Sequence, residues 1–270
     1  MARGDVRREV PTARSTTLCT AKAASAFLGR PQQGRVFSAQ QRVRAGDTTP
    51  SGRARLDSLA RYVVDVADDD AGDAGWPGSA GWVVRRTVMV VRRYPALGEA
   101  LLLETFCSAI GPRWAERTTT ISAGGEPVAQ ACAAWVALDP ATGRPVPLGE
   151  LFQRVYGPSA AGRRASARLH LPPPPPGATA GARPWPLRAI DFDAWRHVNN
   201  VVSWAAVEEE LAAAGWPPAR AEVEYNGAIG PGAAPRLASI AADGTMDLWL
   251  LDGGQVLTSA HLERAGARGS

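Results

Sequence analysis

Residues 191–200 read Asp-Phe-Asp-Ala-Trp-Arg-His-Val-Asn-Asn, which places two carboxylates, one imidazole and two side-chain amides in one short stretch. An extended run, 184–190, precedes it, and a run with helically spaced apolar residues, 201–214, follows it. The stretch is therefore predicted to be a turn between a strand and a helix. Asn199 or Asn200 is the expected N-cap, because a short amide side chain satisfies helix N–H groups that lack a partner in the helix.

The same stretch carries a candidate hydrolytic site. A carboxylate, a histidine and free N–H donors supply general-base catalysis and oxyanion stabilisation. Asp193 and His197 are the candidate catalytic pair, and Asn199 and Asn200 mark the candidate oxyanion site at the start of the helix. Glu209 is a candidate second carboxylate, although a solvated or arginine-paired glutamate is the commoner case. The alternative is a solvated turn whose polar residues only cap the helix.

The rest of the chain follows one plan twice. Each copy is expected to contain a strand, a turn, a helix and four further strands. Turn residues at 111–112 and 124–125 predict that the four later strands of the first copy form an antiparallel meander. The expected ranges are 36–44, 54–69, 82–91, 99–110, 113–122 and 127–138 in the first copy, and 184–190, 201–214, 220–225, 235–242, 246–252 and 256–263 in the second.

The repeat has three matching segments, whose spacing decreases along the chain. Residues 44–47 fall on 188–191 at an offset of 144, residues 96–98 fall on 228–230 at 132, and Gly124-Gly125 falls on Gly253-Gly254 at 129. At the offset of 144, Asp193 and His197 fall on Thr49 and Arg53. Only the second copy therefore carries the candidate pair.

Composition indicates the class of protein and the boundaries of its domains. The chain has 270 residues, 45% of them hydrophobic, and a formal net charge of +4. We expect a disordered tail at 1–35 or, as the less favoured alternative, a removable targeting segment. Two domains are expected at 36–156 and 183–265, with an extended Pro-rich linker at 157–182. Without a long apolar run or an aromatic-interleaved basic stripe, we expect a cytoplasmic protein with no membrane span and no nucleic-acid partner.

Three segments give the chain a family resemblance. They are Arg-Arg-Tyr-Pro-Ala-Leu-Gly-Glu at 92–99, Ala-Gln-Ala-Cys-Ala-Ala-Trp at 129–135, and Asp-Phe-Asp followed by His-Val-Asn-Asn at 191–200. In order and spacing they resemble the plant and bacterial acyl-ACP thioesterases, and more closely an actinobacterial branch. The resemblance implies an α+β fold, a tandem hot-dog in which each antiparallel sheet wraps round a long central helix.

The resemblance also implies hydrolysis of the fatty acyl thioester of acyl carrier protein (ACP), with no metal or organic cofactor. Asp193 and His197 match the family's carboxylate and histidine, and the first hot-dog is associated with the acyl-chain pocket. Three positions depart from the plant pattern, because Trp195 stands in place of an asparagine, and Ala228 and Ile229 in place of Glu-Cys. An acyl-CoA thioesterase and a non-catalytic acyl-binding double hot-dog are therefore the alternatives, and homodimer formation stays open. Cys107 and Cys132 lie in strand patterns and are expected to be structural.

Overall fold

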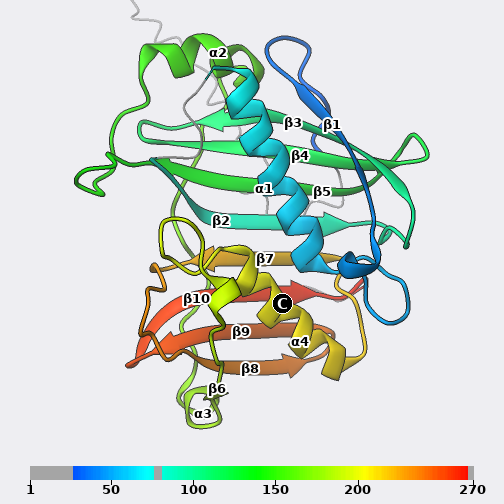
Figure 1. The fold of residues 1–270 in the computed structure, drawn as a ribbon, viewed down its shortest axis with the longest axis vertical. Helices are drawn as coiled ribbons and strands as arrows, with labels where there is room; N and C mark the ends of the chain where they lie inside the picture. Colours follow the sequence, from blue (N-terminus) through cyan, green and yellow to red (C-terminus); the bar gives the residue numbers. More distant parts are fainter. Residues whose placement is uncertain (1–26, 76–80, 267–270) are drawn as a thin grey trace, which may run out of the picture.

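One antiparallel sheet forms the centre of the molecule (Figure 1). The computed structural model describes residues 27–75 and 81–266. Its ten strands lie in the order β1-β3-β4-β5-β2-β7-β10-β9-β8-β6. Their bounds are Phe37–Arg42 (β1), Trp82–Val91 (β2), Ala100–Ile110 (β3), Trp114–Ala123 (β4), Glu126–Ala137 (β5), Arg183–Pro184 (β6), Arg220–Tyr225 (β7), Arg236–Ala242 (β8), Thr245–Asp252 (β9) and Gln255–Glu263 (β10).

The strand order shows two equivalent halves. Read inward from its own edge, the first half runs β1-β3-β4-β5-β2 and the second runs β6-β8-β9-β10-β7. The halves meet where β2 pairs with β7, in a register that sets Arg86 opposite Glu224 and Val90 opposite Arg220. The sheet is therefore continuous through the junction, and its two outer edges are the short strands β1 and β6.

Two long helices cover one face of this sheet (Figure 1). Helix α1, Leu56–Asp73, belongs to the first half, and α4, Val201–Ala214, belongs to the second. The two helices contact each other, so buried side chains from both halves meet in one hydrophobic core. Helical spacing explains which residues enter it: those buried from α1 include Leu56, Leu59, Ala60 and Val63, and those from α4 include Trp204, Val207 and Leu211.

This architecture confirms the predicted α+β tandem hot-dog. The predicted meander was wrong in one respect, because β2 pairs with β5 and β7 instead of with β3. Only β3, β4 and β5 form a meander. Tight turns predicted these neighbours correctly, whereas the connection from β2 to β3 spans the sheet and leaves no local signal in the sequence.

Backbone angles and hydrogen bonds show which of the predicted repeat offsets are correct. Gly124-Gly125 and Gly253-Gly254 both have positive φ, which agrees with the offset of 129. The middle offset of 132 was wrong. The carbonyl of Val128 accepts the N–H groups of residues 92 and 93, while that of Leu257 accepts those of residues 226 and 227. These equivalent pairs give an offset of 134 (92 to 226), so the sequence match at 96–98 was two residues out of register.

Part of the predicted tail is ordered. Residues 1–26 lie outside the described residues, but 27–35 pack against the first half. The N–H of Leu28 donates to Gln130 Oε1 (2.7 Å), and Gln130 Nε2 donates to the carbonyl of Leu28 (2.8 Å). Arg35 pairs with the buried Asp70 (2.5 Å). These residues are held because Gln130 and Asp70, both fully buried, require polar partners.

The Pro-rich segment also differs from the expected extended linker. Helix α2, Glu150–Ala160, ends within 157–182, and a short helix α3, Pro176–Ala180, lies near its end. Pro176 occupies the first turn of α3, where a proline removes no helical hydrogen bond. Between the two helices the chain is bound to the sheet, since Trp249 Nε1 donates to the carbonyl of Pro172 (2.9 Å). Among the described residues, no helix is long and apolar enough to cross a membrane.

His261 gives the second half a pH-dependent contact. Its Nδ1 lies 2.7 Å from Asp247 Oδ1, and this hydrogen bond raises the histidine pKa above its ordinary value. A raised folded pKa stabilises the protein fully below the unfolded value of about 6.5, and the contribution disappears as the pH rises through the folded pKa. Urea midpoints measured from acidic to alkaline pH should therefore show that His261→Gln costs most at acidic pH. A cost independent of pH would contradict this.

Candidate active site

The predicted turn is held by the side chain of Asp193. Asp193 N–H donates to the carbonyl of His197 (2.9 Å), and Phe192 forms a β-bridge with Val198. Asp193 Oδ1 also accepts the N–H groups of Trp195 (2.9 Å) and His197 (3.2 Å). These bonds occupy one carboxylate oxygen. Its Oδ2 makes no hydrogen bond within the part of the chain that the structure describes, so it is available to a water or a substrate.

The two asparagines differ in role. Asn199 Oδ1 accepts the N–H of Val201 (3.0 Å), which is the capping bond at the start of α4. Asn200 already has helical backbone angles, and its side chain makes no capping bond. His197 is exposed. Within residues 27–75 and 81–266, neither its imidazole nor the side-chain amide of Asn200 forms a hydrogen bond.

Asp191 serves the fold. Its carboxylate is buried and accepts the N–H (2.8 Å) and the guanidinium (2.8 Å) of Arg188. Asp47 occupies the equivalent position in the first half and accepts the N–H of Arg44 (2.8 Å). Because both copies keep this arrangement, the first carboxylate of the Asp-Phe-Asp segment shapes the turn, while the second, Asp193, has no acidic equivalent.

The N-termini of α1 and α4 differ in one decisive bond. Leu56 N–H, at the start of α1, donates to Glu208 Oε1 (2.5 Å), and Arg53 binds the other oxygen of this carboxylate (2.9 Å). Asn200 is the residue equivalent to Leu56 at the offset of 144, and its N–H has no recorded acceptor among the described residues. Val64 stands where the equivalent carboxylate would be. The helix end that binds an anion internally in the first half is therefore open in the second.

Glu209 lies apart from this contact. It is exposed, and its charge adds to that of Asp191 in raising the pKa of Arg188. Its neighbours are engaged, since Glu208 binds Arg53 and Glu210 pairs with Arg183. Glu208, which the sequence analysis did not single out, is the carboxylate of this run that is buried against the other half.

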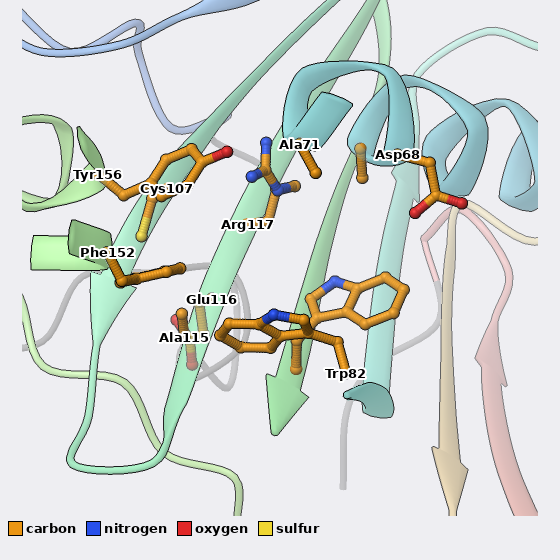
Figure 2. Close-up of a pocket in the computed structure, with 11 residues that line it drawn as sticks. Asp68, Ala71, Trp82, Cys107, Ala115, Glu116, Arg117, Phe152 and Tyr156 are labelled. Carbon is orange, nitrogen blue, oxygen red and sulfur yellow. The ribbon is translucent and has the colours of Figure 1, made fainter. Parts of the chain in front are cut away.

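A pocket lies in the first half (Figure 2). It is enclosed by α1, by strands β2 to β5, and by α2, and most of its surface is apolar. The lining residues are Ala67, Asp68, Ala71, Trp82, Cys107, Ala115, Glu116, Arg117, Trp135, Phe152 and Tyr156. Burial raises the pKa of the Cys107 thiol to about 12, which keeps it protonated near neutral pH and agrees with a structural role. Desolvation also raises the pKa of Asp68.

Helix α2 was missing from the sequence analysis, although it closes this pocket. Phe152 and Tyr156 are buried one turn apart, with ring centroids 4.9 Å from each other. Their spacing of four residues was an available helix signal. It was weak because Gly157 and Pro158 follow immediately, and both residues disfavour a helix interior.

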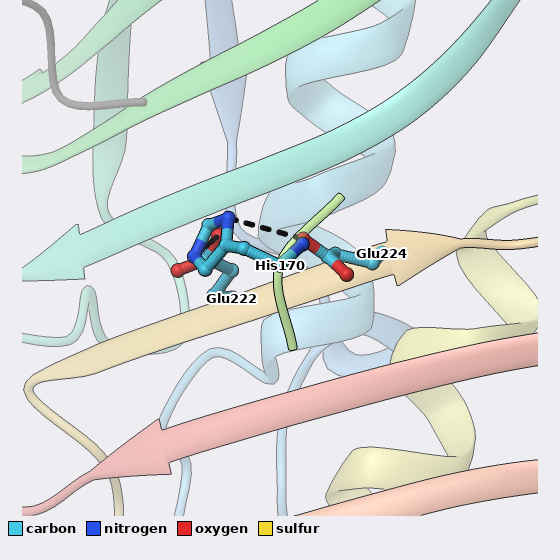
Figure 3. Close-up of side chains that lie close together, drawn as sticks. All are labelled: His170, Glu222 and Glu224. Carbon is cyan, nitrogen blue, oxygen red and sulfur yellow. Dashed lines mark hydrogen bonds and ion pairs between the residues drawn. The ribbon is translucent and has the colours of Figure 1, made fainter. Parts of the chain in front are cut away.

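A second polar cluster lies on the sheet face opposite the helices, at the junction of the halves (Figure 3). His170 Nε2 is 3.2 Å from Glu222 Oε1, and His170 Nδ1 is 3.3 Å from Glu224 Oε1. These three residues form the only group in the described ranges whose donor atoms are close enough to share a metal ion. Arg86 already places positive charge there, 3.2 Å from His170 Nδ1 and 3.8 Å from Glu222 Oε1. We therefore interpret the group as an ion cluster that joins the halves.

Comparison with known proteins assigns a domain family to the first half of the chain. A sequence profile of the acyl-ACP thioesterase N-terminal domain matches residues 34–155. The first half of the chain contains an acyl-ACP thioesterase N-terminal domain. The chain is also 28% identical over 244 residues to an uncharacterised protein of Mycobacterium tuberculosis, a match that covers 88% of this chain and 96% of the relative.

Two plant proteins are also similar to this chain. The chain is 28% identical over 140 residues to the chloroplastic palmitoyl-acyl carrier protein thioesterase of Gossypium hirsutum, a match that covers 47% of this chain and 33% of that protein. Its fold matches the solved 12:0-ACP thioesterase of Umbellularia californica with a TM-score of 0.73, at 20% identity over 86% of this chain and 97% of that one.

The three positions at which the chain departs from the plant pattern lie at or beside the turn. Trp195 is inside it, with 58% of its surface exposed. The carbonyl of Ile229 accepts the N–H of Val198 (2.8 Å), so the 228–229 segment lies directly against the residue after His197. Ile229 is buried and Ala228 is exposed. Neither side chain can supply the acid or thiol that the plant pattern has there.

Proposed function

We propose that this chain hydrolyses the thioester between a fatty acyl group and the phosphopantetheine arm of ACP in the cytoplasm, releasing free fatty acid and holo-ACP. The open N-terminus of α4 is the observation that carries the proposal. Asn200 N–H lacks an acceptor in the described part of the chain, whereas its equivalent, Leu56 N–H, binds a carboxylate. An N–H position that binds an anion in one copy suits the oxyanion of thioester hydrolysis in the other.

Asp193 and His197 supply the remaining chemistry. Asp193 Oδ2 takes a proton from a water whose oxygen bonds to the thioester carbon, and the carbonyl oxygen becomes an oxyanion at the Asn200 N–H. The oxyanion then collapses and the carbon–sulfur bond breaks. The leaving thiolate takes the proton that Asp193 received from the water. His197 orients the water or polarises the carbonyl. The steps use this chain's own groups and water.

The pocket of the first half is the proposed site for the acyl chain. Glu208 of α4 reaches the N-terminus of α1, so the pseudo-twofold relation of the halves places position 64 of α1 near the N-terminus of α4. Ala67 and Ala71 follow on the same side of α1, three and seven residues later, and both line the pocket. An acyl chain that starts at the Asn200 N–H can thus follow α1 into the pocket.

Thiol release from matched acyl-ACP and acyl-CoA substrates tests the function. We expect higher kcat/KM on acyl-ACP, and a preference that decreases with added salt because ACP is acidic and exposed charges are screened. A preference for acyl-CoA that does not depend on salt would mean that CoA is the carrier instead of ACP, with the same hydrolysis of the thioester. Acyl-ACP binding without thiol release would instead favour the non-catalytic double hot-dog, to which the departures at Trp195, Ala228 and Ile229 also point.

Ala71→Phe tests the acyl-chain site in the same assay. The larger side chain fills part of the pocket, so we expect the optimum chain length to become shorter. Each methylene excluded costs about 0.8 kcal/mol, which corresponds to roughly fourfold in kcat/KM. Leu102→Phe is the control, because Leu102 is an exposed residue of β3 and does not line the pocket. An unchanged chain-length profile in Ala71→Phe would exclude this pocket as the acyl site.

A further inference from the structure

Arg196 has a backbone conformation that glycine has in the other half. Its φ is +62°, and its equivalent at the offset of 144 is Gly52 with φ +82°. The two turns have the same bonds, since Arg196 N–H donates to the carbonyl of Asp193 (3.0 Å) and Gly52 N–H donates to that of Thr49 (2.9 Å). A left-handed conformation is unfavourable for a residue with a Cβ atom, and glycine avoids this cost. A ligand-binding role of the side chain would explain why arginine stands at this position.

That side chain has no protein partner in the described residues. Arg196 is exposed and forms no recorded ion pair or side-chain hydrogen bond. Nearby arginines are engaged, because Arg188 binds Asp191 (2.8 Å) and Arg183 pairs with Glu210. The guanidinium of Arg196 is thus a free positive charge directly before His197 in the chain.

Exposed apolar side chains accompany this charge. Trp195 precedes Arg196 and is 58% exposed, and Ile190, on the other side of the Asp-Phe-Asp segment, is 80% exposed. Residues 190–196 lie directly before the Asn200 N–H in the chain, so the carrier arm of a substrate whose thioester lies at this N–H can pass over the surface of the turn. An exposed indole and an exposed guanidinium on consecutive residues suit a ligand with an apolar body and an anionic end.

We propose that Trp195 and Arg196 bind the phosphate end of the 4′-phosphopantetheine arm. The guanidinium pairs with the phosphate, and the indole covers the dimethyl-substituted carbon beside it. The inference rests on the proposed function, because it takes the thioester to be at the Asn200 N–H. It applies equally to ACP and to CoA, since both carriers attach the acyl group through the same phosphorylated arm.

Calorimetric titration with 4′-phosphopantetheine and with pantetheine tests the site without requiring turnover. Arg196→Gly is the informative variant, because glycine is the residue that the equivalent turn has at position 52. A charge-assisted hydrogen bond contributes about 1.5–3 kcal/mol, so we expect the wild-type preference for the phosphorylated ligand to decrease by roughly 10–100-fold. Arg196→Lys should keep part of the preference, because lysine retains the charge and loses the planar fork.

Two controls separate the outcomes. Arg154→Gly removes an exposed arginine of α2 and should leave the preference unchanged. Hydrolysis of acyl-pantetheine, which lacks the phosphate, reports the proposed chemistry independently of Arg196, and acyl-CoA and acyl-ACP assays show which carrier's affinity depends on it. An equal loss of affinity for both ligands, or no loss for either, overturns the inference. Absent thiol release with an intact phosphate preference would overturn the hydrolase proposal alone.

Discussion

Asp193→Asn is expected to lower kcat for thioester hydrolysis by about 10²–10⁴-fold, the usual contribution of a positioned general base. The substitution retains an oxygen that can accept the N–H groups of Trp195 and His197, so the turn should persist. It removes the negative charge that takes the proton from water. Thiol release from acyl-ACP measures kcat, and thermal unfolding measures whether the fold is retained.

Asp47→Asn is the matched control for this result. Asp47 is a buried carboxylate of the equivalent turn in the first half, where it binds Arg44 N–H and the Tyr62 hydroxyl (2.6 Å). We expect this variant to lose stability and to retain kcat per folded molecule. Wild-type kcat in Asp193→Asn, or an equal loss of kcat in both variants, would contradict the assignment of Asp193 as the general base.

Arg86→Met is expected to destabilise the protein by about 3–5 kcal/mol, because it removes the buried cation at the junction of the two halves. Arg86 is 3% exposed and lies beside Glu222 (3.8 Å) and Glu116 (3.9 Å), both also buried. Methionine fills a similar volume, so the expected effect comes from carboxylates that lose a counter-charge. Urea unfolding followed by tryptophan fluorescence measures it.

Arg154→Met provides the comparison for that measurement. Arg154 is 70% exposed and pairs with Glu150 at 3.9 Å, and surface pairs of this kind contribute at most about 1 kcal/mol. We expect the urea midpoint of the Arg154→Met variant to stay close to that of the wild type. If Arg86→Met unfolds at the same urea concentration as Arg154→Met, the junction cluster does not hold the two halves together.

Local patterns in the sequence predicted most secondary-structure elements. Helix α4 and strands β2 and β7 have the predicted bounds, because helical spacing and strand alternation are clear in these segments. The repeat offset of 144 predicted the equivalence of the two turns, which the matching hydrogen bonds at residues 49–53 and 193–197 show. Helix α2 was missed because Gly157 and Pro158 obscure its pattern.

The sequence by itself determined the two copies of one strand-and-helix plan and the turn that carries Asp193 and His197, because helical spacing, strand alternation and turn residues are local patterns. The hot-dog fold itself was implied by the family resemblance. Only the tertiary structure decided which helix N-terminus is open. That depends on Glu208, 152 residues from Leu56, whose N–H it binds across the contact between α1 and α4. The strand order and the cluster around Arg86 were likewise decided by folding, since burial and charge pairing join residues that share no local pattern.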